Sequence, residues 1–257
     1  MKRYPQTRRW KNSFPMILVS IIMICVCLTG GNGGARAEAE VPQSDASVER
    51  QPTAEALPWL ELNPDTVGWL KVGNIIDTPV VQRDNAFYLE HDFYGEEYSG
   101  GTVFIDEECS IMPRDDHLVF YGHNMKNGTV FGELDRFRDL SYLKKYPIVT
   151  FDTIYGEGQY VIFAVYDMSA ETEDPHFMQM LHFNFIDNED LWNFLYEVRR
   201  RNFYDIPIDV EYGDQLISLI TCSYTLYDGR MILMCRAIRP DEDPQEIAAL
   251  MQSTVKK

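Results

Sequence analysis

Short apolar runs separated by turn residues recur along the chain from residue 67 onward, and this repetition limits the folds open to it. Runs of this length bounded by Gly, Pro, Asn or Asp are typical of strands in all-β proteins. The sequence holds eight such runs, at 67–72, 80–82, 101–105, 117–121, 148–152, 160–167, 216–221 and 231–238. Eight short strands with these turn signals predict a mostly antiparallel barrel or sandwich.

One long amphipathic segment interrupts the runs between residues 187 and 201. Its apolar residues recur with the spacing of one helix face, at Leu191, Phe194, Leu195 and Val198. It ends in three arginines, 199–201, which suit a helix C-terminus better than a binding patch. We expect a helix here, just before the seventh run, with shorter helices near 53–62 and 131–138.

The first 37 residues are typical of a targeting segment. A basic start is followed by an apolar run from Phe14 to Leu28, and Ala35-Arg36-Ala37 then resembles a cleavage site. The run is short for a membrane span but usual for a signal-peptide core, so a cleaved signal peptide and a retained membrane anchor both stay open. In either case the basic end stays in the cytoplasm and the rest is exported.

Composition divides the exported remainder into three parts. Residues 38–52 are polar and charged and predict a disordered linker. Residues 53–240 hold all eight apolar runs and predict one folded domain. Residues 241–257 form a C-terminal tail with room for a short helix.

Charge and cysteine content narrow the function. The chain carries −17, and because residues 1–37 contribute +6, the remainder carries −23. Such an acidic body argues against nucleic acid as a partner, since binding to phosphates needs basic residues. The five cysteines show no metal-ligand spacing and are too few for a disulfide framework.

The segment 216–235 contains a candidate catalytic cysteine. Cys222 follows an apolar run and lies at the end of a predicted strand. Asp228-Gly229 predicts a turn, after which Arg230 lies beside Cys222 on the neighbouring strand. A fixed positive charge next to a thiol favours the thiolate, which is the nucleophile in acyl transfer. Most free cysteines are small core hydrophobes, and Cys235, which follows four apolar residues, is interpreted that way.

A cysteine nucleophile needs a proton acceptor, and the chain offers five histidines. His123 follows the strand-like run 117–121 and stands where that strand gives way to a loop, a common position for reactive groups. His117 lies beside Asp115-Asp116 and is interpreted as exposed or salt-bridged. His91 and His182 adjoin aromatic residues and are interpreted as packing or surface groups, and His176 as a loop residue.

Three separated segments together resemble the active-site motifs of sortases, and most closely those of class B. They are Tyr-Gly-His-Asn-Met at 121–125, Ile-Thr-Cys at 220–222 and Gly-Arg at 229–230. Further similar stretches are Asn-Pro-Asp-Thr-Val-Gly-Trp-Leu at 63–70, Pro-Val-Val-Gln at 79–82, His-Asp-Phe at 91–93 and Gly-Thr-Val-Phe-Gly-Glu-Leu at 128–134. The resemblance covers about residues 55 to 239.

This resemblance implies a closed eight-stranded sortase-type β-barrel with an N-terminal helical extension and one long helix before the cysteine strand. It implies Cys222 as nucleophile, His123 as general acid/base and Arg230 as oxyanion stabiliser, with no cofactor and no metal. The implied reaction is transpeptidation at the outer face of the cell membrane. Exported proteins bearing a C-terminal sorting signal would be cleaved through a thioacyl-enzyme. The acyl group would pass to an amine of a peptidoglycan precursor or a pilin lysine.

Some residues depart from the family pattern. Ser218 replaces the usual first Thr of the cysteine motif, and class B members often have Ser where Ile220 stands and an acidic residue where Ser223 stands. The substrate-binding candidates are Thr221, Ile220, Ser223 and Asn124. The resemblance favours a retained N-terminal anchor over a cleaved signal.

Three alternatives stay open. Arg236 is the rival of Arg230 for the arginine role, although it lies further from the turn. Water in place of an amine would make the protein a thiol peptidase that releases free acid. The protein would instead be an exported binding module if it kept this fold but did not catalyse acyl transfer.

Overall fold

A computed structural model describes residues 50–257. The predicted targeting segment, 1–37, and most of the predicted linker, 38–52, lie outside these residues. Between residues 50 and 257, no helix is long and apolar enough to cross a membrane.

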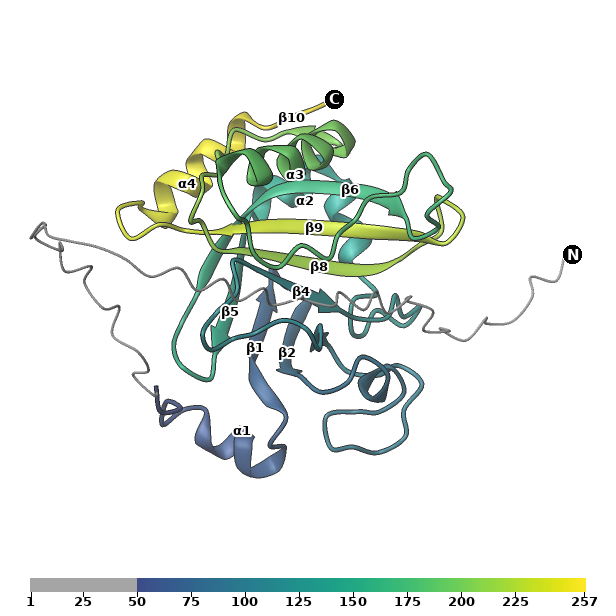
Figure 1. The fold of residues 1–257 in the computed structure, drawn as a ribbon, viewed down its shortest axis with the longest axis vertical. Helices are drawn as coiled ribbons and strands as arrows, with labels where there is room; N and C mark the ends of the chain where they lie inside the picture. Colours follow the sequence, from purple (N-terminus) through teal and green to yellow (C-terminus); the bar gives the residue numbers. More distant parts are fainter. Residues whose placement is uncertain (1–49) are drawn as a thin grey trace, which may run out of the picture. The chain divides into compact units, whose positions relative to one another are not determined.

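The described chain is built around a closed barrel of eight strands (Figure 1), in the order β1-β2-β3-β4-β8-β9-β6-β5. Each of the eight predicted runs supplies one strand, so the predicted closed barrel is confirmed. The strands are β1 (Thr66–Val72), β2 (Ile76–Val81), β3 (Phe104–Ile105), β4 (His117–Tyr121), β5 (Ile148–Thr153), β6 (Gln159–Ser169), β8 (Leu216–Ser223) and β9 (Gly229–Ala237).

The barrel is mostly antiparallel, but two junctions are parallel: β2 with β3 and β4 with β8. Parallel neighbours need a long crossover, and the chain between β4 and β8 contains β5, β6 and the longest helix. The parallel pairing makes β4 and β8 end at the same rim of the barrel. β9 starts at that rim because it runs antiparallel to β8.

Helices surround the barrel. The predicted long helix is α3 (Asn188–Arg201), whose N-cap Asp187 accepts a hydrogen bond from the Asp190 amide. The segment expected as a helix at 131–138 is instead a shorter 3-10 helix, η2 (Leu134–Arg138), preceded by Val130 with a positive φ of 57°. The other elements are α1 (Leu57–Leu62), η1 (Phe87–Leu89), α2 (Leu140–Lys145), β7 (Tyr204–Asp205), α4 (Pro244–Leu250), η3 (Met251–Ser253) and β10 (Val255–Lys256).

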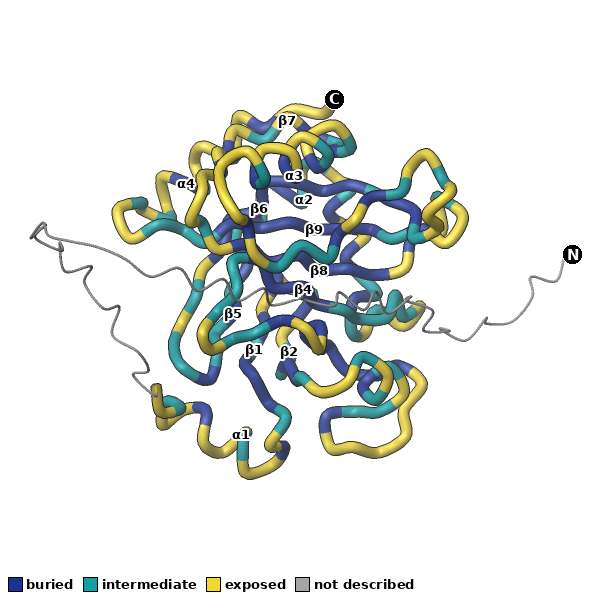
Figure 2. Tube along the Cα trace, in the orientation of Figure 1, coloured by how far each residue is buried: buried dark blue, intermediate teal, exposed yellow. Residues whose placement is uncertain are grey.

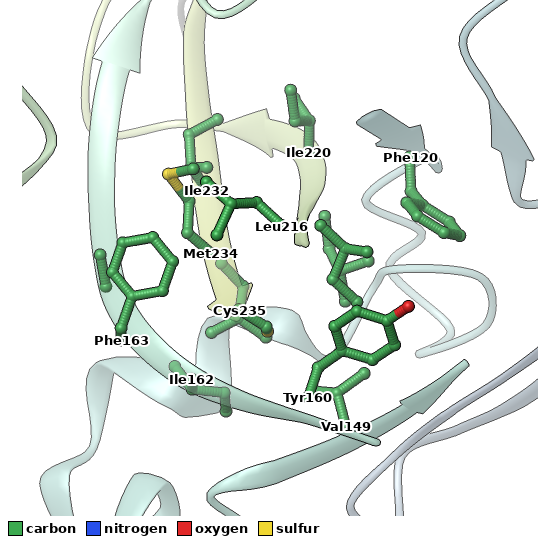
Figure 3. Packing of buried hydrophobic residues seen from close by; sticks show 14 of the residues in the cluster. Phe120, Val149, Tyr160, Ile162, Phe163, Leu216, Ile220, Ile232, Met234 and Cys235 are labelled. Carbon is green, nitrogen blue, oxygen red and sulfur yellow. The ribbon is translucent and has the colours of Figure 1, made fainter. Parts of the chain in front are cut away.

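Burial follows the barrel strands, while the connecting loops are exposed (Figure 2). Side chains of β5, β6, β8 and β9 pack together in one cluster (Figure 3), in which Cys235 is fully buried. Ile247 of α4 and Met251 of η3 belong to the same cluster. The C-terminal segment therefore packs on the barrel and contributes to its core.

Candidate active site

Cys222 is the exposed cysteine of the described chain. Cys109 and Cys235 are both buried, and burial raises the pKa of the Cys109 thiol to about 12. Cys222 occupies the second-last position of β8 and is the exposed residue of that strand, between the buried Thr221 and Ser223. A thiol must be accessible to attack a peptide, so the structure singles out Cys222 as the candidate nucleophile.

Arg230 lies directly opposite Cys222 on the neighbouring strand, because the register of β8 and β9 pairs the two residues. Side chains of directly paired residues stand on the same face of a sheet. Asp228 adopts a positive φ of 42° and closes the connection, and its carboxylate accepts a hydrogen bond of 2.8 Å from Arg230 Nη1. The predicted hairpin is present, with a loop of residues 224–228 between its strands.

His123 is brought level with Cys222 by the register of β4 and β8. Paired residues of these strands, such as Tyr121 and Ile220, lie 99 positions apart, which is also the separation of His123 and Cys222. The register continues past the end of β4 through hydrogen bonds on either side of His123. The Thr221 hydroxyl donates to the Gly122 carbonyl at 2.8 Å, and the Asn124 side-chain amide donates to the Cys222 carbonyl at 2.8 Å.

The imidazole of His123 is oriented by the chain before β3. Its Nε2 lies 2.9 Å from the Leu89 carbonyl oxygen, and because a carbonyl only accepts, Nε2 carries the proton. This leaves Nδ1 as the nitrogen for proton transfer. Gly122 is required next to it, since a Cβ there would lie 2.7 Å from the Phe131 ring and 3.0 Å from Val130.

Tyr121 belongs to the same end of the barrel. Its hydroxyl donates to the Asp106 carboxylate at 2.9 Å. Burial and then the charge of Asp106 raise the pKa of Tyr121, whereas the charge of Arg230 opposes the rise. Tyr121 is therefore a neutral hydrogen-bonding group that lies within the field of the Arg230 guanidinium.

Comparison with known proteins identifies the family. A sequence model of the sortase domain matches residues 71–238. The chain belongs to the sortase family. Among curated relatives, sortase B of Listeria monocytogenes is 30% identical over 182 residues, covering 69% of this chain and 72% of the relative. Sortase B of Staphylococcus aureus is 28% identical over 183 residues, covering 70% and 72%.

Solved structures agree with this assignment to class B. A Staphylococcus aureus sortase B–substrate complex matches with a TM-score of 0.66 and 26% identity, over 74% of this sortase and 87% of that chain. Clostridium perfringens sortase B matches with a TM-score of 0.62 and 31% identity, over 71% and 99%. The chain is thus a class B sortase by both sequence and fold, and its family implies cell-wall sorting by a cysteine transpeptidase.

Of the four substrate-binding candidates in this sortase, three have buried side chains. Ile220 packs in the core, and the Thr221 hydroxyl donates a hydrogen bond to the Gly122 carbonyl. Ser223 is bonded to Arg138. We propose that these three residues hold the site together, whereas Asn124 lies at the rim with its amide on the Cys222 carbonyl.

Arg236, the rival arginine, lies at the far end of β9. Its side chain is fully buried and pairs with Glu242, with Nη2 2.9 Å from Oε1. Six residues separate it from Arg230 along a strand, about 20 Å at 3.3 Å per residue. It is therefore too distant from Cys222 to take part at that rim.

The other histidines have structural contacts. His117, expected to be exposed or salt-bridged, is fully buried between β4, β8 and α3; that expectation was wrong because its ring faces α3. Its Nε2 lies 2.6 Å from the Ser218 hydroxyl and its Nδ1 2.9 Å from the His182 carbonyl. His91 stacks on Phe87, as the adjacent aromatic residues indicated.

Sequence reasoning missed two contributors to the site. Leu89 acts through its carbonyl, which no side-chain pattern reveals. Asp106 follows β3 and bonds Tyr121, but its position in the chain marks it only as a turn residue. Within residues 50–257 no cluster of three or more His, Cys, Asp or Glu could hold a metal ion.

Proposed function

We propose that this sortase cleaves the C-terminal sorting signal of exported proteins through a thioacyl-enzyme and passes the acyl group to an amine. The observation that carries the proposal is the register at the barrel rim. Cys222 and Arg230 are paired across β8 and β9, and His123 lies at the same level after β4. A nucleophile, a fixed cation and a proton carrier on one rim suit acyl transfer.

In the first step, the Cys222 thiolate forms a bond to the carbonyl carbon of the scissile peptide. The carbonyl oxygen gains negative charge, and the Arg230 guanidinium donates hydrogen bonds to it. The carbon–nitrogen bond then breaks. The leaving nitrogen takes the proton that His123 accepted from the Cys222 thiol when the thiolate formed, and the acyl group remains on sulfur as a thioester.

In the second step, an amine attacks the thioester carbon. His123 removes a proton from that amine as the new carbon–nitrogen bond forms, and the carbon–sulfur bond breaks to restore the thiolate. The acceptor is an amine of a peptidoglycan precursor or a pilin lysine. If water attacks instead, the product is a free acid, as in a thiol peptidase.

The partners follow from this chemistry. The substrates are exported proteins with a C-terminal sorting signal, and the enzyme acts at the outer face of the cell membrane. The segment 1–37, with its basic start and apolar run, would hold it there. A sortase B–substrate complex has been solved for the Staphylococcus aureus relative, which supports substrate binding by this fold.

The test uses the full chain and a set of peptides that carry candidate sorting signals, each incubated with and without glycinamide. We expect mass spectrometry to find a product joined to glycinamide when it is present. The Cys222→Ala variant should give neither cleavage nor ligation. Cleavage that persists in Cys222→Ala would overturn the mechanism.

The product distribution separates the alternatives. Free acid alone, at every glycinamide concentration, would identify a hydrolase. No reaction with any peptide, by a chain that is folded by circular dichroism, would favour a binding module on the sortase fold.

A further inference from the structure

The loop that follows Cys222, residues 224–228, is fastened to the barrel at both ends. At its far end, the Ser169 hydroxyl donates to the Tyr227 carbonyl at 3.1 Å, and the Ala170 amide donates to the Asp228 carbonyl at 3.1 Å. Ser169 is the last residue of β6, and Ala170 follows it directly. At its near end, a separate set of side chains holds the loop, and Arg138 of η2 is its centre.

Arg138 and Asp167 form a two-point ion pair. Nη1 and Nη2 of Arg138 donate to the two carboxylate oxygens of Asp167 at 2.8 and 2.6 Å, with side-chain exposures of 27% and 11%. Paired donors in this fork geometry fix direction as well as distance. Burial disfavours the charge of Arg138, but hydrogen bonds to Asp167 and Asp135 outweigh it and raise the pKa of Arg138.

Ser223 and Thr225 complete a closed circuit with this pair. Arg138 Nη2 donates to the Ser223 hydroxyl at 3.2 Å, and the Thr225 hydroxyl donates to Asp167 at 2.6 Å. The two hydroxyls lie 2.8 Å apart, so Ser223 must donate to Thr225. Each hydroxyl thereby donates once and accepts at least once, with Arg138 as the donor and Asp167 as the acceptor at the two ends of the chain of hydroxyls.

The circuit acts on the residue next to the nucleophile. Ser223 is buried and follows Cys222 directly in β8, so the two side chains stand on opposite faces of the sheet. A rotation of the backbone at Ser223 would turn Cys222 away from the rim. A fixed Ser223 side chain therefore fixes the direction of the thiol.

We propose that Arg138, Asp167 and Thr225 are positioning residues that act through Ser223 to hold the Cys222 thiol on the face it shares with Arg230. The proposal rests on the proposed acyl transfer. It predicts that loosening the circuit lowers the rate of the chemical step, since displacement of a reacting group by about 1 Å can cost about 100-fold.

The decisive comparison is Thr225→Val with Thr225→Ser in the full chain, because Thr225 is exposed and the two variants differ in the hydroxyl that binds Asp167. We expect Thr225→Val to lower kcat for signal-peptide cleavage by about tenfold with a smaller change in KM, and Thr225→Ser to retain the parent values. The alkylation rate of Cys222 by iodoacetamide, followed by the mass of its peptide, should fall only in Thr225→Val.

Arg138→Met provides a stronger perturbation, with an expected loss in kcat of about 100-fold. Arg136→Met is its matched control, because Arg136 lies on the same turn, is exposed and pairs with the half-buried Glu133 in an ion pair. Equal kcat and alkylation rate in Thr225→Val, Thr225→Ser and the parent would overturn the proposal, as would a loss confined to KM. Alkylation does not depend on the sorting signal, so it decides the positioning role even if no peptide is cleaved.

Discussion

At the residue scale, the described cysteines show how position decides reactivity. Cys109 and Cys235 are surrounded by core, and burial raises the pKa of both thiols. Cys222 has the same side chain, but it lies one position before the end of β8 and is exposed. Its distinguishing neighbour is Arg230, paired with it across the hairpin. The chemistry therefore depends on one pair of residues at a rim.

Replacement of Arg230 tests this pair. We expect Arg230→Met to reduce kcat for peptide cleavage by about 10²–10³-fold, because a single oxyanion donor contributes about 3–4 kcal/mol in acyl transfer. Steady-state kinetics with a signal peptide measure the loss. Arg136→Met, at an exposed ion pair on η2, should change kcat little. Comparable losses in the two variants would contradict the role given to Arg230.

At the element scale, β9 carries two arginines with different roles. Arg230 is the second residue of β9 and pairs with Cys222 of β8, whereas Arg236 is buried near the other end of β9. Arg236 Nε donates to the Asp209 carbonyl at 3.1 Å, and the guanidinium pairs with Glu242 beyond the strand. This hydrogen-bonded pair lowers the pKa of Glu242. One end of β9 thus supplies the site, and the other attaches the C-terminal segment.

Removal of Arg236 should therefore affect stability rather than catalysis. We expect Arg236→Met to lower the free energy of unfolding by about 3–5 kcal/mol, since removing one partner of a buried ion pair leaves the other charge without its counter-charge. Urea titration followed by circular dichroism measures this change. The kcat per folded molecule should remain near that of the parent. A large fall in kcat with unchanged stability would reverse the assignment of the two arginines.

At the scale of the whole molecule, His117 connects β4, β8 and α3 within the core. Burial lowers its pKa to about 4 from an ordinary value of 6.5. The neutral ring donates from Nδ1 to the His182 carbonyl and accepts from the Ser218 hydroxyl at Nε2. Because unfolding exposes the ring, the unfolded state binds a proton that the folded state does not hold between these two pKa values.

This difference makes stability depend on pH in a defined window. Between pH 6.5 and about 4 the unfolded state binds more protons, so the free energy of unfolding falls as the pH falls. We expect His117 to contribute a loss of about 2 kcal/mol between pH 7 and pH 5. Urea titrations at the two pH values measure the loss. In His117→Gln the difference between the two pH values should shrink by that amount; an unchanged difference would refute the contribution.

Much of the fold and part of the site could be predicted from the chain. The apolar runs, the amphipathic repeat before Cys222 and the Asp228-Gly229 signal depend on local spacing, and local spacing determines strands, helices and turns. The neighbours of a strand end are not local. His117 looked exposed beside two aspartates, but its ring packs near Phe194 of α3. Local sequence spacing does not predict a contact between residues so far apart in the chain.

The sequence by itself determined eight strands, a long helix and a cysteine opposite an arginine in one hairpin. Only the tertiary structure decided that β4 and β8 are parallel neighbours with an offset of 99 residues, which places His123 level with Cys222. It also decided that Arg138 and Asp167 meet behind Ser223. The physical reason is that pairing across a long crossover is chosen by packing of the closed barrel, which draws on residues far apart in the chain.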